Sequence, residues 1–298
     1  MTDENSAFLD AVLHGRQHTD EEWESYLEAF HSRFPSANGL FTLMRTYAGF
    51  TTYELLANNV AESSPKMVLE VACGDGNLMD FLPDLLPQDA RVVAVDVSEE
   101  ELQVARRRFN SDSRILFLRA RARALPFEDT TFDTVVSHQF LNFVPDVAAA
   151  IREMVRVLRP GGTLHVATNR GWLDRREHTW VYLYDAALEA ATSLHPEMLR
   201  NQRMSDKRIY SEEGIREIFS EHPSLRLSTL ETQVVYPNAR MTPERVADIY
   251  NRLYLFGSLP DKEPIRDAVT RKARELCGDA DELIVEIPFR LIRIRKGF

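Results

Sequence analysis

The chain of 298 residues contains 36 Lys and Arg against 46 Asp and Glu, so its formal net charge of −10 argues against nucleic acid or an anionic membrane as partner and favours a small molecule. Hydrophobic residues make up 44% and charged residues 28%, the balance of a globular protein, and the length predicts one large domain with an appendage or two smaller domains. Cys73 and Cys277 are far apart and lack CxxC spacing, so the sequence indicates neither a disulfide framework nor a metal site.

The first segment of the chain predicts helices. Its start, MTDENSAFLD, lacks the basic residues and apolar run of a signal peptide, and no stretch of about 18 apolar residues occurs anywhere, so we expect a cytoplasmic protein without a membrane segment. Thr19 with Glu22, and Thr51 with Glu54, have capping-box spacing ahead of apolar positions at helical intervals. We expect residues 1–62 to form an N-terminal helical cap.

The middle of the chain alternates short apolar strands with amphipathic helices. The strands read MVLEVA, VVAVDV, ILFL, TVVSH and TLHVAT, and such alternation predicts parallel βαβ units. Ser98 and Asp146 are start signals for two connecting helices, and residues 159–162 predict a turn. We expect residues 63–170 to form an α/β core with a Rossmann-like, doubly wound, mainly parallel sheet.

The last part of the chain is less regular. It predicts a helix over residues 182–193, another from Ser211, a strand near residues 225–236, a further helical insert and a closing β-rich segment, ELIVEIPFRLIRIR. We expect residues 171–298 to complete the sheet and to carry helical inserts that cover a substrate.

The sharpest chemical signal is VLEVACGDGNL, where a buried strand ends in Glu70 and enters a glycine loop. Gly74 and Gly76 allow a ligand to approach the backbone. About twenty residues later Asp96 ends the second strand, where a carboxylate can accept both hydroxyl protons of a ribose. The sequence therefore predicts a nucleoside site between two strand-end carboxylates.

A nicotinamide or flavin dehydrogenase is the obvious rival interpretation. Its fingerprint needs a third small residue where this chain has Met79. Glu70 and Asp75 would also place negative charge beside a pyrophosphate. The acidic loop suits a cationic ligand better.

The segment from Val68 to Thr168 resembles the class I S-adenosylmethionine-dependent methyltransferase family, particularly its small-molecule branch that includes quinone-biosynthesis enzymes. The motifs VLEVACGDGNL, VVAVDVS, ALPFEDTTFDTVVSHQFLNFVPD and EMVRVLRPGGTLHVAT follow the family's order and spacing. The resemblance implies S-adenosyl-L-methionine as cofactor, S-adenosylhomocysteine as product, and methyl transfer to a small-molecule acceptor.

The resemblance also implies which residues hold the cofactor. The glycine loop would surround the methionine part, Asp96 would hold the ribose, Val97 would pack on adenine, and the end of the fourth strand would lie near the sulfonium. The residues implied are Tyr53, Glu70, Ala72, Gly74, Asp75, Gly76, Asp96, Val97, Arg121, Ala122, Ser137 and His138.

Two positions depart from the family pattern: LNFVPD stands where the family often has leucine followed by two histidines, and Arg121 stands at an adenine-binding position. Family members usually have an aspartate that accepts the adenine amino group four residues before the Leu-Pro-Phe turn, where this chain has Arg121. Arginine has no acceptor, so either the amino group is met by backbone or another carboxylate, or Arg121 stacks on the ring or points to water. Ala122 does match the family and offers its backbone to adenine.

His138, at the end of the fourth strand, is the candidate catalytic residue. A histidine there can accept a proton during methyl transfer, a role worth about 10²–10⁴-fold when the geometry is right. The alternative is that it orients the substrate or satisfies a buried backbone group, because the sulfonium is already an excellent leaving group and alignment is the protein's main contribution.

The acceptor is expected over the carboxyl ends of the strands, near Gln139 and Asn142, with Trp180 and Tyr184 of the inserts as an aromatic lining. The same aromatic residues can instead belong to the core. Two alternatives to methylation stay open: a methyltransferase-like fold used for pericyclic or decarboxylative chemistry, and a noncatalytic binding role. Assembly as a homodimer is also left open.

Overall fold

The computed structural model describes residues 6–34, 37–169, 178–198, 205–221, 227–253 and 255–297. Its contacts divide the chain into two compact units, and each is built from segments that are distant in the sequence. The first unit comprises Met1–Ala37, Gly171–Arg203 and Asn238–Pro288, and the second comprises Asn38–Arg170, Met204–Pro237 and Phe289–Phe298.

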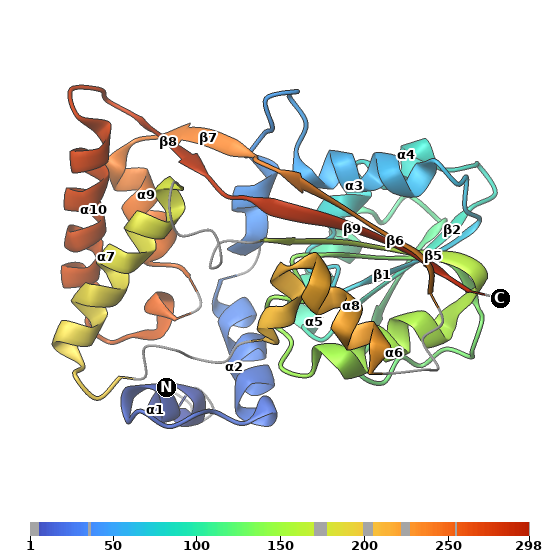
Figure 1. Cartoon of the computed structure of the whole chain (residues 1–298), viewed down its shortest axis with the longest axis horizontal. Helices are drawn as coiled ribbons and strands as arrows, with labels where there is room; N and C mark the ends of the chain where they lie inside the picture. Colours follow the sequence, from blue (N-terminus) through green and yellow to red (C-terminus); the bar gives the residue numbers. More distant parts are fainter. Residues whose placement is uncertain are drawn as a thin grey trace. The chain divides into compact units, whose positions relative to one another are not determined.

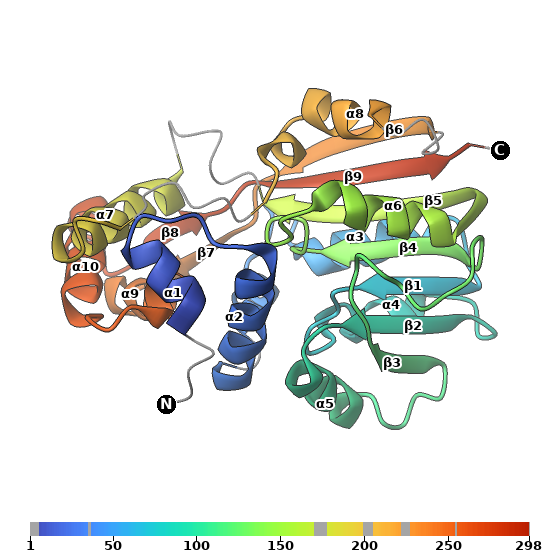
Figure 2. The ribbon, with the colours of Figure 1, turned by 90° about the horizontal axis from the view of Figure 1, so that it is seen from below.

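A seven-stranded sheet forms the centre of the second unit (Figures 1 and 2). Its strands are β1 (Met67–Val71), β2 (Arg91–Asp96), β3 (Ile115–Arg119), β4 (Phe132–His138), β5 (Leu158–Asn169), β6 (Leu227–Val235) and β9 (Phe289–Lys296). The spatial order is β3-β2-β1-β4-β5-β9-β6. Strands β1 to β5 run parallel, and β9 lies antiparallel between β5 and β6. This confirms the predicted Rossmann-like, mainly parallel sheet.

Helices cover both faces of this sheet. Figures 1 and 2 show α3 (Thr52–Ala61) and α4 (Leu82–Leu85) on one face, and α6 (Val147–Val157) and α8 (Glu212–Ser220) on the other. Helix α5 (Glu99–Arg108) packs along β2 and β3, and short 3-10 helices span Ala37–Thr42, Asn77–Asp80 and Lys207–Tyr210. Leu69, Val135, Met154, Ile218 and Ile294 belong to the apolar core of this unit. The sheet is therefore doubly wound, as the βαβ pattern predicted.

The predicted helix starts are confirmed. Thr19 and Thr51 each form a complete capping box with the glutamate three residues later. Ser98 and Asp146 accept a backbone N–H with their side chains at the starts of α5 and α6. Such caps fix the first turn of a helix because they satisfy backbone donors that have no partner within the helix.

The turn predicted over residues 159–162 is wrong. These residues lie inside β5, where Leu158 pairs with Phe132 and the next paired residue, Thr163, lies opposite Thr134. The four residues between them lie opposite Asp133 alone, so the register of the pairing shifts here, and Gly161 has a φ of +75°. The Pro-Gly-Gly sequence therefore bends a strand that continues beyond it.

The first unit contains a small helical assembly and a two-stranded sheet. Its helices are α1 (Ser6–Leu13), α2 (Asp20–Arg33), α7 (Thr179–Leu194), α9 (Pro243–Tyr250), α10 (Glu263–Cys277) and a 3-10 turn at Phe256–Ser258. Strands β7 (Asn238–Met241) and β8 (Leu283–Glu286) pair antiparallel. Phe8, Trp23 and Tyr26 are fully buried and pack ring against ring, and α10 packs against both α7 and α9.

The two units follow different boundaries from the three segments expected from the sequence. Helices α1 and α2 of the expected N-terminal cap belong to the first unit, whereas α3 belongs to the second. The expected boundary at residue 170 lies outside the described residues. Within the parts of the chain that the structure covers, no helix has the length and apolar character needed to cross a bilayer.

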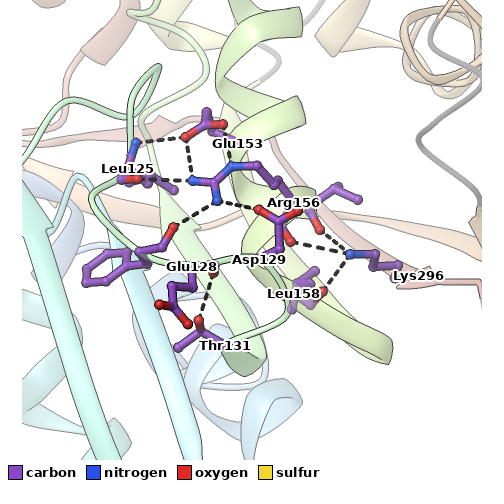
Figure 3. A network of polar contacts seen from close by, with 10 residues as sticks. Leu125, Glu128, Asp129, Thr131, Glu153, Arg156, Leu158 and Lys296 are labelled. Carbon is purple, nitrogen blue, oxygen red and sulfur yellow. Dashed lines mark hydrogen bonds and ion pairs between the residues drawn. The ribbon is translucent and has the colours of Figure 1, made fainter.

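Arg156, in the last turn of α6, is the centre of a polar network before the start of β4 (Figure 3). Its guanidinium donates to the carbonyl oxygens of Leu125 and Phe127 at 3.0 and 2.8 Å, to Asp129 at 2.8 Å, and to both carboxylate oxygens of Glu153 at 2.7 and 2.9 Å. Hydrogen bonds and charge in this network raise the pKa of the Arg156 guanidinium and lower that of the Glu153 carboxyl. The network fixes the loop that enters β4.

We expect Arg156→Ala to lower the free energy of unfolding by about 2–3 kcal/mol, because two carbonyls and two carboxylates lose their donor together. Arg156→Lys should fall between this variant and the wild type, since an ammonium cannot reproduce the planar fork. Urea unfolding measures both. A stability of Arg156→Ala equal to that of the wild type would contradict the role given to the network.

Candidate functional site

The carboxyl ends of β1 and β4 are where the sheet's strand order reverses. The chain passes from β1 outward through β2 and β3, and then returns to β4 on the other side of β1. Ligands of open α/β sheets bind outside the strand ends at such a point. Most of the sequence-predicted cofactor residues lie in the last residues of β1, β2 or β4 or in the loops that follow β1 and β2.

The loop after β1 has an unusual backbone. Ala72, Gly74 and Gly76 have φ values of +61°, +53° and +84°. A Cβ on Gly74 would meet no atom within 4 Å, whereas one on Gly76 would come within 3.0 Å of the Phe109 ring. Gly76 therefore allows close packing under the loop, and Gly74 leaves open space in front of the backbone.

Asp96 ties this loop to the end of β2. Its carboxylate accepts the N–H of Gly74 at 2.8 Å and the N–H of Ser98 at 2.9 Å. Asp96 is partly exposed at the end of β2.

Glu70 is buried beside other carboxylates. Only 2% of the residue is exposed, and its Oε2 has no hydrogen-bond partner among the described residues. Burial, followed by the nearby charges of Asp96 and Asp75, raises the pKa of the Glu70 carboxyl well above its usual value. Asp75 itself accepts from Asn77 Nδ2 at 2.6 Å and lies 3.5 Å from Arg108. A cation placed here would relieve the cost of the buried carboxylate.

Ser137 and His138 end β4 with different environments. Ser137 is fully buried and donates to the carbonyl oxygen of Val71 at 2.9 Å, which joins β4 to β1. His138 Nε2 lies 2.8 Å from Thr52 Oγ1, and its ring stacks on Tyr53 with a centroid distance of 3.8 Å. Burial lowers the pKa of His138 to about 3. The imidazole is therefore neutral at physiological pH.

The structure brings Gln139 and Asn142 together at the end of β5. Gln139 Oε1 accepts the N–H of Asn169 at 3.0 Å. Asn142 Oδ1 accepts the hydroxyl of Thr168 at 2.5 Å, and its Nδ2 donates to Asn169 O at 3.2 Å. Both predicted substrate residues thus belong to one polar cluster.

The predicted adenine residues lie after β2 and β3. Val97 is half-buried, and its carbonyl oxygen accepts from Arg119 Nε at 2.8 Å. Arg121 has an exposed side chain and bridges to Ala124 through the backbone. Ala122 is half-buried and packs against the apolar core. Adenine binding by these three residues stays a prediction.

Trp180 and Tyr184 lie on α7 in the first unit. The hydroxyl of Tyr250 donates to the carbonyl oxygen of Trp180 at 2.6 Å, and the Tyr184 ring lies 5.1 Å from Phe256. They take part in the packing of their own unit. Their role toward a substrate stays a prediction.

Sequence reasoning missed the residues that pack around His138. Phe289, at the start of β9, stacks on the imidazole with a centroid distance of 5.7 Å, and Phe41 meets it edge-on at 6.1 Å. Thr52 could have been identified from the sequence, because it follows the capping residue of α3. Phe289 could not, since only the order of the strands in the sheet brings β9 near β4. Over the described ranges, no group of three His, Cys, Asp or Glu is placed to hold a metal ion.

Comparison with known proteins gives matches in both sequence and structure. Residues 69–166 match the family described as a methyltransferase domain. A demethylmenaquinone methyltransferase of Staphylococcus saprophyticus is 30% identical over 141 residues, which are 46% of this chain and 60% of that protein. The chain therefore spans about three fifths of the length of this curated relative.

Solved structures resemble most of the chain. A Haemonchus contortus phosphoethanolamine N-methyltransferase 2, solved with phosphomonomethylethanolamine and S-adenosylhomocysteine, has a TM-score of 0.51 at 17% identity and covers 91% of this chain and 60% of its own. The [4+2]-cyclase SpnF has a TM-score of 0.53 at 17% identity and covers 91% of this chain and 94% of its own. At such identities the likeness shows the fold alone.

Proposed function

The chain contains a class I S-adenosylmethionine-dependent methyltransferase domain, and from this premise we propose that the protein transfers the methyl group of S-adenosylmethionine to a medium-sized small-molecule acceptor. The name of the demethylmenaquinone methyltransferase relative supports an aromatic, quinone-like acceptor. The net charge of −10 supports a small molecule over nucleic acid.

The acidic glycine loop is the observation that carries this proposal. S-adenosylmethionine brings a sulfonium and an ammonium against one carboxylate, so a site with excess negative charge complements it. Glu70, Asp75 and Asp96 provide that charge around Gly74. The unpartnered Oε2 of Glu70 and the open space at Gly74 both fit such a ligand.

The protein's contribution to the reaction is alignment. When bound, the cofactor supplies an electrophilic methyl group on a sulfonium. Asp96 would hold the ribose hydroxyls, and Glu70 with Asp75 would hold the amino-acid end, so that the methyl group faces the acceptor. Holding two reactants in line removes about 7–11 kcal/mol of the barrier at most.

His138 suits a positioning role better than that of a base in this proposal. With its pKa near 3, the imidazole is a weak proton acceptor at neutral pH. Its hydrogen bond to Thr52 and its stacking on Tyr53 instead connect the end of β4 to helix α3. We propose that it keeps these two elements in register beside the cofactor.

Calorimetry with S-adenosylhomocysteine tests the cofactor site. We expect Asp96→Ala to weaken binding about 10- to 100-fold, because charged hydrogen bonds to the ribose are lost. Asp267→Asn, at an exposed position of α10, is the matched control and should bind as the wild type does. Unchanged affinity in Asp96→Ala would show that the ribose site is misassigned.

A second candidate function is nonmethylating chemistry, because the same fold serves the cyclase SpnF over nearly its whole length. The mass of the product separates the two functions. Methyl transfer adds the mass of one CH₂ to the acceptor, whereas a pericyclic rearrangement adds nothing.

A further inference from the structure

Gln139 holds a buried hydrogen-bond donor that no described residue uses. The residue is 4% exposed, and its Nε2 has no acceptor in the parts of the chain that the structure describes. Its Oε1 accepts the backbone N–H of Asn169 at 3.0 Å. Because a backbone N–H can only donate, this bond fixes the orientation of the amide, and the unused end must be the NH₂ group.

The backbone holds this donor in place. Gln139 has a φ of +56°, a left-handed conformation that costs free energy in a residue with a side chain, and its own N–H donates to Ala167 O at 2.7 Å. Residues kept in such conformations cluster at binding and catalytic sites. The residue directly follows His138 at the end of β4.

The side-chain amide of Asn142, in the same cluster, has hydrogen bonds at both of its ends. Asn142 uses both ends of its side chain, accepting from Thr168 and donating to Asn169. It therefore has the bonds of a structural residue. Gln139 uses its side-chain oxygen in one structural hydrogen bond, and its NH₂ group has no acceptor among the described residues.

On the basis of the proposed function, we propose that Gln139 selects the acceptor by donating to an anionic oxygen, so that the substrate is an enolate or phenolate and not an amine. An amine has a single lone pair, and a donor bound to it would block the attack on the methyl group. An enolate or phenolate oxygen has several lone pairs and shares its charge with carbon, so it can bind Gln139 and still react.

The reaction on such an acceptor balances simply. The acceptor loses its hydroxyl proton to solvent, and an electron pair of its oxygen or conjugated carbon forms the new bond to the methyl group. The sulfur–methyl bond breaks, and its electrons stay on sulfur in S-adenosylhomocysteine. The Gln139 amide donates throughout and is neither protonated nor deprotonated. A donor aimed at the acceptor oxygen keeps the nucleophile ionised and oriented.

Binding of a coloured enolate tests this inference. The probe is 2-hydroxy-1,4-naphthoquinone, which is an enolate at neutral pH, titrated into protein saturated with S-adenosylhomocysteine. Gln139→Glu keeps the acceptor for Asn169 and replaces the donor by a carboxylate, so we expect enolate affinity to fall about 100-fold. Gln139→Met should lower it about 10- to 100-fold, as expected for the loss of a hydrogen bond to a charged group.

Two controls separate a role in substrate selection from a structural one. Gln233→Met, at an exposed position of β6, should bind the enolate as the wild type does. Binding of 2-naphthylamine should be equally weak in the wild type and both Gln139 variants, and all proteins should keep their affinity for S-adenosylhomocysteine within about twofold.

Three outcomes would overturn the assignment of Gln139: an enolate that fails to bind the wild type, equal enolate affinity in the wild type and Gln139→Glu, or loss of S-adenosylhomocysteine binding in both Gln139 variants. A wild-type protein that does not bind S-adenosylhomocysteine would contradict the proposed function itself. The calorimetric titration therefore distinguishes the failure of the one from the failure of the other.

Discussion

The Glu70→Gln protein is expected to melt at a higher temperature than the wild type at pH 7.5 and to bind S-adenosylhomocysteine at least about 100-fold more weakly. Glu70 is buried with an unpartnered oxygen, and Asp96 and Asp75 add like charge. A neutral amide of the same shape removes this cost, so we expect a gain of about 1–3 kcal/mol, or roughly 3–8 °C. It also removes the charge that would attract a cationic ligand.

The gain in stability of Glu70→Gln should increase with pH. The folded state raises the pKa of Glu70, so it binds a proton more tightly than the unfolded state does. The loss of folding stability that Glu70 causes therefore begins above its ordinary pKa of about 4.5 and grows as the pH rises. We expect the difference in melting temperature between Glu70→Gln and the wild type to disappear when the pH approaches 4.5.

Thermal melts at pH 4.5, 6 and 7.5, with calorimetry at pH 7.5, measure both effects. Glu128→Gln, at an exposed position before β4, is the control and should change neither melting temperature nor affinity. A Glu70→Gln protein that is less stable than the wild type and binds the ligand with equal affinity would contradict the electrostatic account. It would identify Glu70 as an ordinary buried structural residue.

The sequence predicted the parts of the fold that have local causes. Apolar runs of four to six residues matched β1 to β4; β1 and β4 are buried on both faces, and such strands need no polar alternation. Thr19 and Thr51 located the helix starts because a capping box is complete within four residues. Asp96 was identified by its spacing from the glycine loop, and the structure joins the two through Gly74.

Features that depend on distant contacts could not be predicted in this way. The closing segment ELIVEIPFRLIRIR reads as continuous β structure, yet it divides between β8 of the first unit and β9 of the second. The Pro160-Gly161-Gly162 sequence is typical of a turn, but β5 continues through it, because Leu158 before it and Thr163 after it both pair with β4. The neutral state of His138 results from burial under Tyr53 and Phe289, which are far away in the sequence.

His138 and His165 should make the second unit sensitive to acid. Both are buried, and burial is the main cause that lowers the pKa of each from 6.5 to about 3, with a smaller contribution from Arg293 at His165. The unfolded chain therefore binds protons that the folded chain excludes. The contribution of these two histidines to stability should be constant above about pH 6.5 and fall as the pH drops from there toward 3.

The loss of stability at a given pH follows from the difference between that pH and the pKa of histidine in the unfolded chain. At pH 5 each histidine is about 1.5 units below its unfolded value and still neutral in the folded state, which costs about 2 kcal/mol per residue. Protonation of Glu70 in the folded state acts in the opposite direction over part of this range, so the total for the wild type does not isolate the histidines. A comparison between variants does isolate them.

His165→Asn is the informative variant, because His165 lies inside β5 and a neutral amide cannot take up the proton. Urea unfolding at pH 7.5 and pH 5.0 should show a loss of stability on acidification that is about 2 kcal/mol smaller in this variant than in the wild type. Gln233→Asn, at an exposed position of β6, changes no titratable group and should leave the pH dependence unchanged. If His165→Asn and the wild type lose the same stability, the imidazole must gain a proton partner in the folded state at pH 5, and burial alone does not govern its titration.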